Sequence, residues 1–167
     1  SNTNIYIIGE YFGSGNLGTT NISGSVGISS LFLCKYRGTD GVAVWTRGFP
    51  SGGNNIGKGI ALDRGGNLAI CGAIFSADFG GGTISGNGSG STFLARIKSS
   101  DGTQISAKVF GSGYSVANGI AVDANTNLFI TGYFLSSIPF DATTITASGY
   151  GGFVVKTDSS LATSWVR

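Results

Sequence analysis

The sequence contains no histidine, and Glu10 is its only glutamate. Histidine is the usual general base near neutral pH and the commonest metal ligand, so both kinds of chemistry lose their most frequent residue. The seven aspartates have structural explanations, because several stand at the starts of turns, where a carboxylate can accept backbone N–H groups. We therefore expect no catalytic residue, no metal site and no cofactor.

Charge is also scarce, with ten basic and eight acidic residues dispersed over 167 positions and a net charge of +2. So weak and even a balance does not favour binding to nucleic acid or to an anionic membrane. No apolar run approaches the roughly 20 residues that span a bilayer. Abundant Gly, Ser, Thr and Asn indicate a neutral polar surface, which is common outside cells.

Cysteine and proline are also scarce, with two residues of each. Cys34 and Cys71 each stand in a short apolar run, LFLC and LAIC, which favours small buried apolar side chains. A disulfide between them is an open alternative, because spacing alone does not show whether their strands meet.

Thirty glycines separate short runs rich in Val, Ile and Phe, and the pattern recurs about every sixty residues. Residues 59–75 read GIALDRGGNLAICGAIF and residues 119–134 read GIAVDANTNLFITGYF. The chain opens with SNTNIYIIGEYF, which matches the same unit without its GIAVD head. Two further positions repeat with the same period. They are Phe32, Phe93 and Phe153, and Ile22, Ile84 and Ile145.

Each repeat predicts four antiparallel strands. The first is GIALD or GIAVD, the second NLFITGYF, the third GFVVKT and the fourth AVWTR, QISAK or TSWVR. A long Gly/Ser/Thr loop containing the Thr/Ile segment connects the second strand to the third. Asp-Gly at 40–41 and 101–102 predicts hairpins, since glycine supplies the positive φ that these turns require. The last copy has DSSLA there and must use a different loop.

Four antiparallel strands repeated at sixty residues predict an all-β chain of β-propeller blades, with approximate boundaries 1–56, 57–116 and 117–167. A β-sandwich has no reason to repeat at this period, and a parallel β-helix repeats at a shorter one. GIAVD, NLFITGYF, TTIT, GGFVVKTDSS and a closing Trp together resemble the bacterial β-propeller repeat called the SBBP repeat. The resemblance implies the propeller fold and a place in large surface or secreted proteins.

Because the first copy lacks its first strand, we expect its open edge to be completed by flanking blades of a longer chain or by another copy of the protein. A ring needs at least about four blades. Two copies would supply six, and a head-to-tail contact that does not close would give a filament.

A few residues are candidates for binding or modification. Asn21 and Asn87 begin Asn-X-Ser triplets in the same loop of two copies and are candidate glycosylation acceptors. Trp45 and Trp165 could stack on sugars, although filling the space between blades is the favoured interpretation. The basic positions that recur in the third and fourth strands are interpreted as outward residues on alternating strands rather than as an anion site. Asp123-Ala-Asn-Thr-Asn127 is interpreted as a turn rather than as a calcium loop.

The sequence thus predicts a non-catalytic structural or adhesive component of an extracellular surface, sheath or filament. The alternative is a carbohydrate- or protein-binding propeller module of a larger secreted protein. The expected partners are further copies or flanking blades and, for the alternative, glycans. An enzyme is disfavoured.

Overall fold

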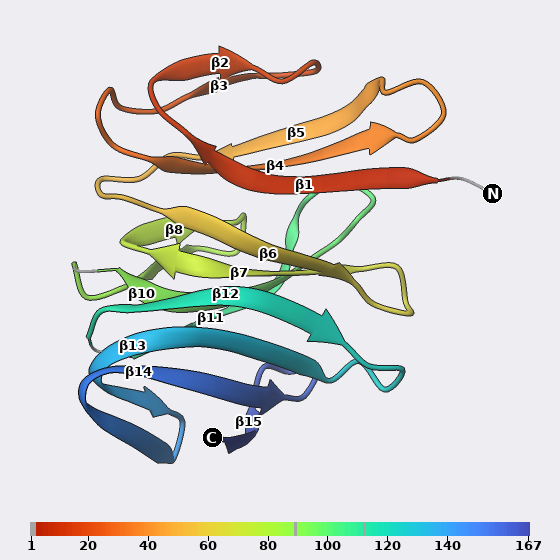
Figure 1. Cartoon of the computed structure of the whole chain (residues 1–167). Helices are drawn as coiled ribbons and strands as arrows, with labels where there is room; N and C mark the ends of the chain where they lie inside the picture. Colours follow the sequence, from red (N-terminus) through yellow and green to blue (C-terminus); the bar gives the residue numbers. More distant parts are fainter. Residues whose placement is uncertain (1–2, 89, 112) are drawn as a thin grey trace.

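Each sequence repeat forms its own antiparallel sheet, and the three sheets follow one another along the chain (Figure 1). The computed structural model describes residues 3–88, 90–111 and 113–167. The first sheet has the order β1-β4-β5, the second β11-β10-β7-β6 and the third β12-β13-β14-β15. Two short hairpins, β2–β3 and β8–β9, lie outside these sheets.

The strands have the following bounds. The first sheet contains β1 (Asn4–Tyr11), β4 (Ser30–Arg37) and β5 (Ala43–Phe49), with β2 (Ser14–Asn16) and β3 (Asn21–Ser23) between β1 and β4. The second contains β6 (Ile56–Leu62), β7 (Leu68–Ile74), β10 (Ser91–Ile97) and β11 (Gln104–Phe110), with β8 (Ser76–Asp78) and β9 (Thr83–Ser85) between β7 and β10. The third contains β12 (Ser115–Val122), β13 (Leu128–Phe140), β14 (Thr143–Thr157) and β15 (Thr163–Val166).

The prediction of an all-β chain with four strands in each full repeat and three in the first is confirmed. The long loop differs from expectation, because its Thr/Ile segment pairs as a strand in every copy. In the first two copies it forms a separate hairpin, whereas in the third it lengthens β13 and β14. The described residues contain no helix, and so none that could cross a membrane. Their sheets remain separate and do not close into a ring.

The core lies between the sheets, in two layers. One apolar cluster joins the first and second sheets and includes Leu33, Trp45, Leu68 and Ile70. The other joins the second and third sheets. All of β7 is buried, because its alternate residues enter the two layers in turn. A continuous apolar run is therefore what a strand covered on both faces requires.

Glycines stand where neighbouring strands approach so closely that there is no room for a side chain. A Cβ on Gly72 would come within 1.9 Å of the Ile56 carbonyl oxygen and 3.0 Å of the Phe93 ring. A Cβ on Gly132 in the third sheet would likewise clash with a backbone oxygen and with the Phe153 ring. The first strands β6 and β12 each carry a β-bulge opposite these glycines.

One five-residue turn occurs three times. In the first, Asp63 N–H donates to the Asn67 carbonyl, and the Asp63 carboxylate accepts the Asn67 N–H at 2.8 Å. The fourth residue has positive φ in each copy, and it is Gly66, Thr126 and Leu161. The predicted role of the turn aspartates is confirmed. DSSLA does use a loop different from the Asp-Gly hairpins, and that loop is this same Asp turn.

The positive-φ position provides a matched pair of substitutions. Left-handed φ costs a β-branched residue roughly 1–2 kcal/mol, and glycine avoids this cost at some loss of chain entropy. We expect Thr126→Gly to raise the free energy of unfolding by about 0.5 kcal/mol and Gly66→Thr to lower it by about 1 kcal/mol. Urea denaturation measures both. Equal effects of the same sign would contradict this account of the turn.

Candidate functional sites: contacts between sheets and a groove beside β3

Basic and tryptophan side chains of the first sheet bind backbone carbonyls of the second. Lys35 Nζ and Trp45 Nε1 both donate to the Ser99 carbonyl at 3.1 Å, and Arg47 Nε donates to the Asp101 carbonyl at 3.0 Å. Both acceptors lie in the Asp-Gly turn between β10 and β11. The first sheet therefore holds the second by a turn of its backbone as well as by apolar packing.

The second sheet holds the third in a related way. Arg96 donates to the Ser159 carbonyl at 3.0 Å and to the carboxylate of buried Asp63 at 2.5 Å. Lys108 donates to the Leu161 carbonyl at 3.1 Å and pairs with Asp141. The Ser159 and Leu161 carbonyls lie in the turn between β14 and β15, and Asp141 lies between β13 and β14. Asp63 belongs to the second sheet's own turn between β6 and β7.

Asp141 strengthens this second contact. Partial burial alone would raise the pKa of Asp141, but hydrogen bonds from Lys108 and from the Thr163 amide together lower it below its usual value. The aspartate is therefore held in its charged form opposite Lys108. Sequence reasoning missed these cross-sheet contacts, and the only signal for them was the recurrence of basic residues in the third and fourth strands.

The two outer faces of the stack expose residues whose counterparts are buried. Ile5 and Ile7 in β1 are 49% and 41% exposed, whereas the corresponding Leu68 and Ile70 of β7 are fully buried against the first sheet. At the other end, Val154 of β14 is 39% exposed. Its counterparts, Leu33 and Leu94, are buried under the next sheet. The outer faces thus repeat surfaces that sheets cover elsewhere in the molecule.

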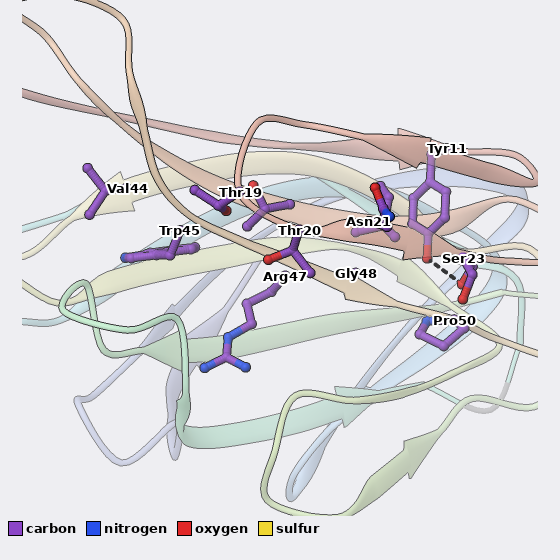
Figure 2. Close-up of a pocket in the computed structure, with 12 residues that line it drawn as sticks. Tyr11, Thr19, Thr20, Asn21, Ser23, Val44, Trp45, Arg47, Gly48 and Pro50 are labelled. Carbon is purple, nitrogen blue, oxygen red and sulfur yellow. Dashed lines mark hydrogen bonds between the residues drawn. The ribbon is translucent and has the colours of Figure 1, made fainter.

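A groove of about 560 Å³ runs between the β2–β3 hairpin and β5 (Figure 2). Asn21 and Ser23 come from the hairpin, Trp45 and Arg47 come from β5, and Tyr11 Oη donates to the Ser23 carbonyl at 3.1 Å. Hydroxyls, an amide, an indole edge and one guanidinium can bind a neutral polar ligand. No carboxylate, cysteine or histidine is among the residues that line the groove, so they supply no acid–base pair.

The structure brings only two of the four candidate site residues together. Asn21 and Trp45 line the same groove, while Asn87 and Trp165 lie elsewhere. Asn21 is exposed and accepts a hydrogen bond from Asn16 Nδ2 at 2.6 Å. Asn87 is exposed and accepts one from the Ser91 hydroxyl, and Ser89 of its triplet lies outside the described residues.

The two tryptophans have different environments. Trp45 is 9% exposed, and its ring fills the layer between the first and second sheets. Trp165 is 38% exposed, and its ring lies 6.2 Å from that of Phe129. Of the two, Trp165 therefore offers the larger accessible ring surface.

Both cysteines are free and fully buried, which confirms the prediction of small buried side chains. Burial raises the pKa of the Cys71 thiol to about 12, so it stays protonated and unreactive at neutral pH.

Asp123 likewise has a structural role. A hydrogen bond from the Asn127 side chain, with others from backbone amides, lowers the pKa of Asp123. Its oxygens bind the turn, and within residues 3–88, 90–111 and 113–167 no three potential metal-binding side chains of His, Cys, Asp or Glu type cluster.

No protein-family model matches the chain, and no curated protein matches it either.

The two tryptophans also test the cross-sheet contact. We expect Trp45→Phe to lower the free energy of unfolding by about 1–3 kcal/mol, because it removes the bond to the Ser99 carbonyl and leaves a small cavity. Trp165→Phe, on the exposed face, serves as the matched control and should change it by less than about 0.5 kcal/mol. Denaturation of dilute samples compares them, and equal losses would contradict the assignment.

Proposed function

We propose that the protein is a non-catalytic structural or adhesive component of an extracellular surface, sheath or filament, and that it assembles through the open ends of its stack of sheets. The observation that carries this proposal is the exposure of Ile5, Ile7 and Val154. Residues at the same positions of the neighbouring repeats are buried between sheets. Apolar side chains exposed at both ends of a stack are typical of surfaces that another sheet covers.

The finer fold assignment belongs to the same proposal. We propose that the three sheets are β-propeller blades and that the chain is related to the SBBP repeat proteins. The strand order, which follows the chain within every sheet, supports this assignment, as does the sixty-residue period. A fourth strand beside β1 would make the first sheet equal to the other two.

The extracellular assignment rests on composition and on the candidate acceptors. The low charge and the polar loops support it. So does Asn21, whose side chain is exposed on the β2–β3 hairpin. Occupancy of Asn21 would require passage through a secretory pathway.

Sedimentation velocity tests the assembly. We expect the average mass of the purified chain to rise with concentration between about 1 µM and about 500 µM, a range that covers weak protein–protein contacts. A monomer at all concentrations would contradict the proposal.

The groove beside β3 supports the alternative function, a carbohydrate- or protein-binding module. Its hydroxyl and amide groups suit a neutral sugar, and the edge of Trp45 borders it. Under this alternative we expect a specific signal on a glycan array that Arg47→Ala and Thr20→Ala reduce. An array without specific binding would count against it.

A further inference from the structure

In the first sheet, Lys35, Trp45 and Arg47 form a cluster that binds the second sheet. The outer face of the third sheet carries a second copy of this cluster. Lys35 lies over the Tyr6 ring at 5.6 Å, and the rings of Tyr6 and Trp45 are 6.4 Å apart. In the third sheet, Lys156 lies over the Phe129 ring at 5.4 Å, and the rings of Phe129 and Trp165 are 6.2 Å apart. Arg167 follows Trp165 as Arg47 follows Trp45. We call Lys156, Trp165 and Arg167 the donor cluster.

The donor cluster lacks the acceptors that the first sheet's cluster has. Neither Lys156 nor Trp165 donates to a carbonyl oxygen within the part of the chain that the structure describes, and Arg167 reaches only the adjacent Val166 carbonyl. The indole is correspondingly exposed. Contacts with the Phe129 ring hold Lys156 and Trp165 in this arrangement without an acceptor.

The matching acceptor exists at the opposite end of the molecule. Residues 37–42, here called the acceptor turn, repeat the backbone of residues 98–103. In both, the first N–H donates to the last carbonyl, and the glycine before the last residue has positive φ, 69° in Gly41 and 75° in Gly102. The two turns thus present their carbonyls in the same way.

The acceptor turn is open where its counterpart is covered. A Cβ on Gly102 would lie 2.9 Å from Arg47 and 3.0 Å from the Trp45 ring, whereas nothing lies within 4 Å of the same position on Gly41. Gly38 and Asp40 correspond to Ser99 and Asp101 of the covered turn. Among the described residues, no hydrogen bond reaches the carbonyls of Gly38 and Asp40.

The donor cluster and the acceptor turn also match the residue types of an internal contact. Within the chain, a Lys/Trp/Arg cluster binds an Asp-Gly turn, while the Arg96 and Lys108 pair binds the shorter Asp turn of the third sheet. The donor cluster is again Lys/Trp/Arg, and the acceptor turn is again Asp-Gly. A contact between them would repeat one that the molecule already makes.

We propose that the donor cluster of one copy binds the acceptor turn of a second copy. This inference rests on the proposed function, which supplies the premise that the chain assembles with its own copies. Lys156 and Trp165 donate to the Gly38 carbonyl, and Arg167 donates to the Asp40 carbonyl. Val154 then packs on Ile5 and Ile7 in place of Leu33 on Leu68 and Ile70.

This contact is heterologous, so it closes into a ring or continues as a filament. Among the described residues, the first sheet has no counterpart of β6. Inside the molecule, β6 packs against both β1 and β12. We therefore expect the contact between copies to be weaker than the internal ones and to depend on concentration.

Two blocked variants and their mixture test the proposal by sedimentation velocity of the full chain. The donor-blocked variant is Lys156→Glu with Trp165→Ala. The acceptor-blocked variant is Val42→Lys with Ile5→Lys, which places cations where the donor cluster would arrive. Val42→Lys alone, in an exposed turn, serves if the double variant fails to fold. Leu62→Lys and Ile105→Lys, at exposed apolar positions of the second sheet, are the matched controls.

Each blocked variant should raise the dissociation constant at least about tenfold, as expected for a central aromatic or charged contact, and the controls should not. An equimolar mixture of the two should form a heterodimer, because one intact donor cluster then meets one intact acceptor turn. Assembly that neither variant weakens, or a mixture that stays monomeric while the wild type assembles, would overturn this inference alone. A monomeric wild type would overturn the proposed function with it.

Discussion

The structure depends on packing the apolar faces of its sheets against one another. The second sheet lies between the other two and is covered on both faces. Its neighbours are covered on one side each. The same sequence unit forms a fully buried strand in β7 and a partly exposed one in β1, although the same Asn-Leu/Ile pattern opens both runs, at Asn4-Ile5 and Asn67-Leu68. Position in the stack, rather than local sequence, decides the difference.

Apolar packing alone does not fix how one sheet is oriented on the next, since it is non-directional. The bonds from Lys35, Trp45 and Arg47 to carbonyls of a turn supply that direction. Because the acceptors belong to the backbone, the side chains of the turn can vary between repeats without loss of the contact. This explains how turns as different as SSDG and DSSLA both receive basic side chains.

Much of the fold follows from the sequence. The strands, the Asp-Gly hairpins and the turn aspartates were predicted from local patterns, because alternation and glycine placement act over a few residues. The hairpins β2–β3 and β8–β9 were not, since three-residue strands carry too little periodicity. The cross-sheet contacts were missed because a backbone carbonyl has no sequence signature. Leu161 at positive φ was unpredictable for a related reason, as its burial outweighs its backbone preference.

The two tryptophan indoles report the central claim directly, that one cluster serves both inside the chain and between copies. Solvent exchange of the Nε1–H groups, followed by NMR over a range of concentrations, separates them. The account predicts that Trp45 is protected at every concentration, while Trp165 exchanges freely in dilute samples and becomes protected as copies associate. Free exchange of Trp45, or association that leaves Trp165 in fast exchange, would contradict it.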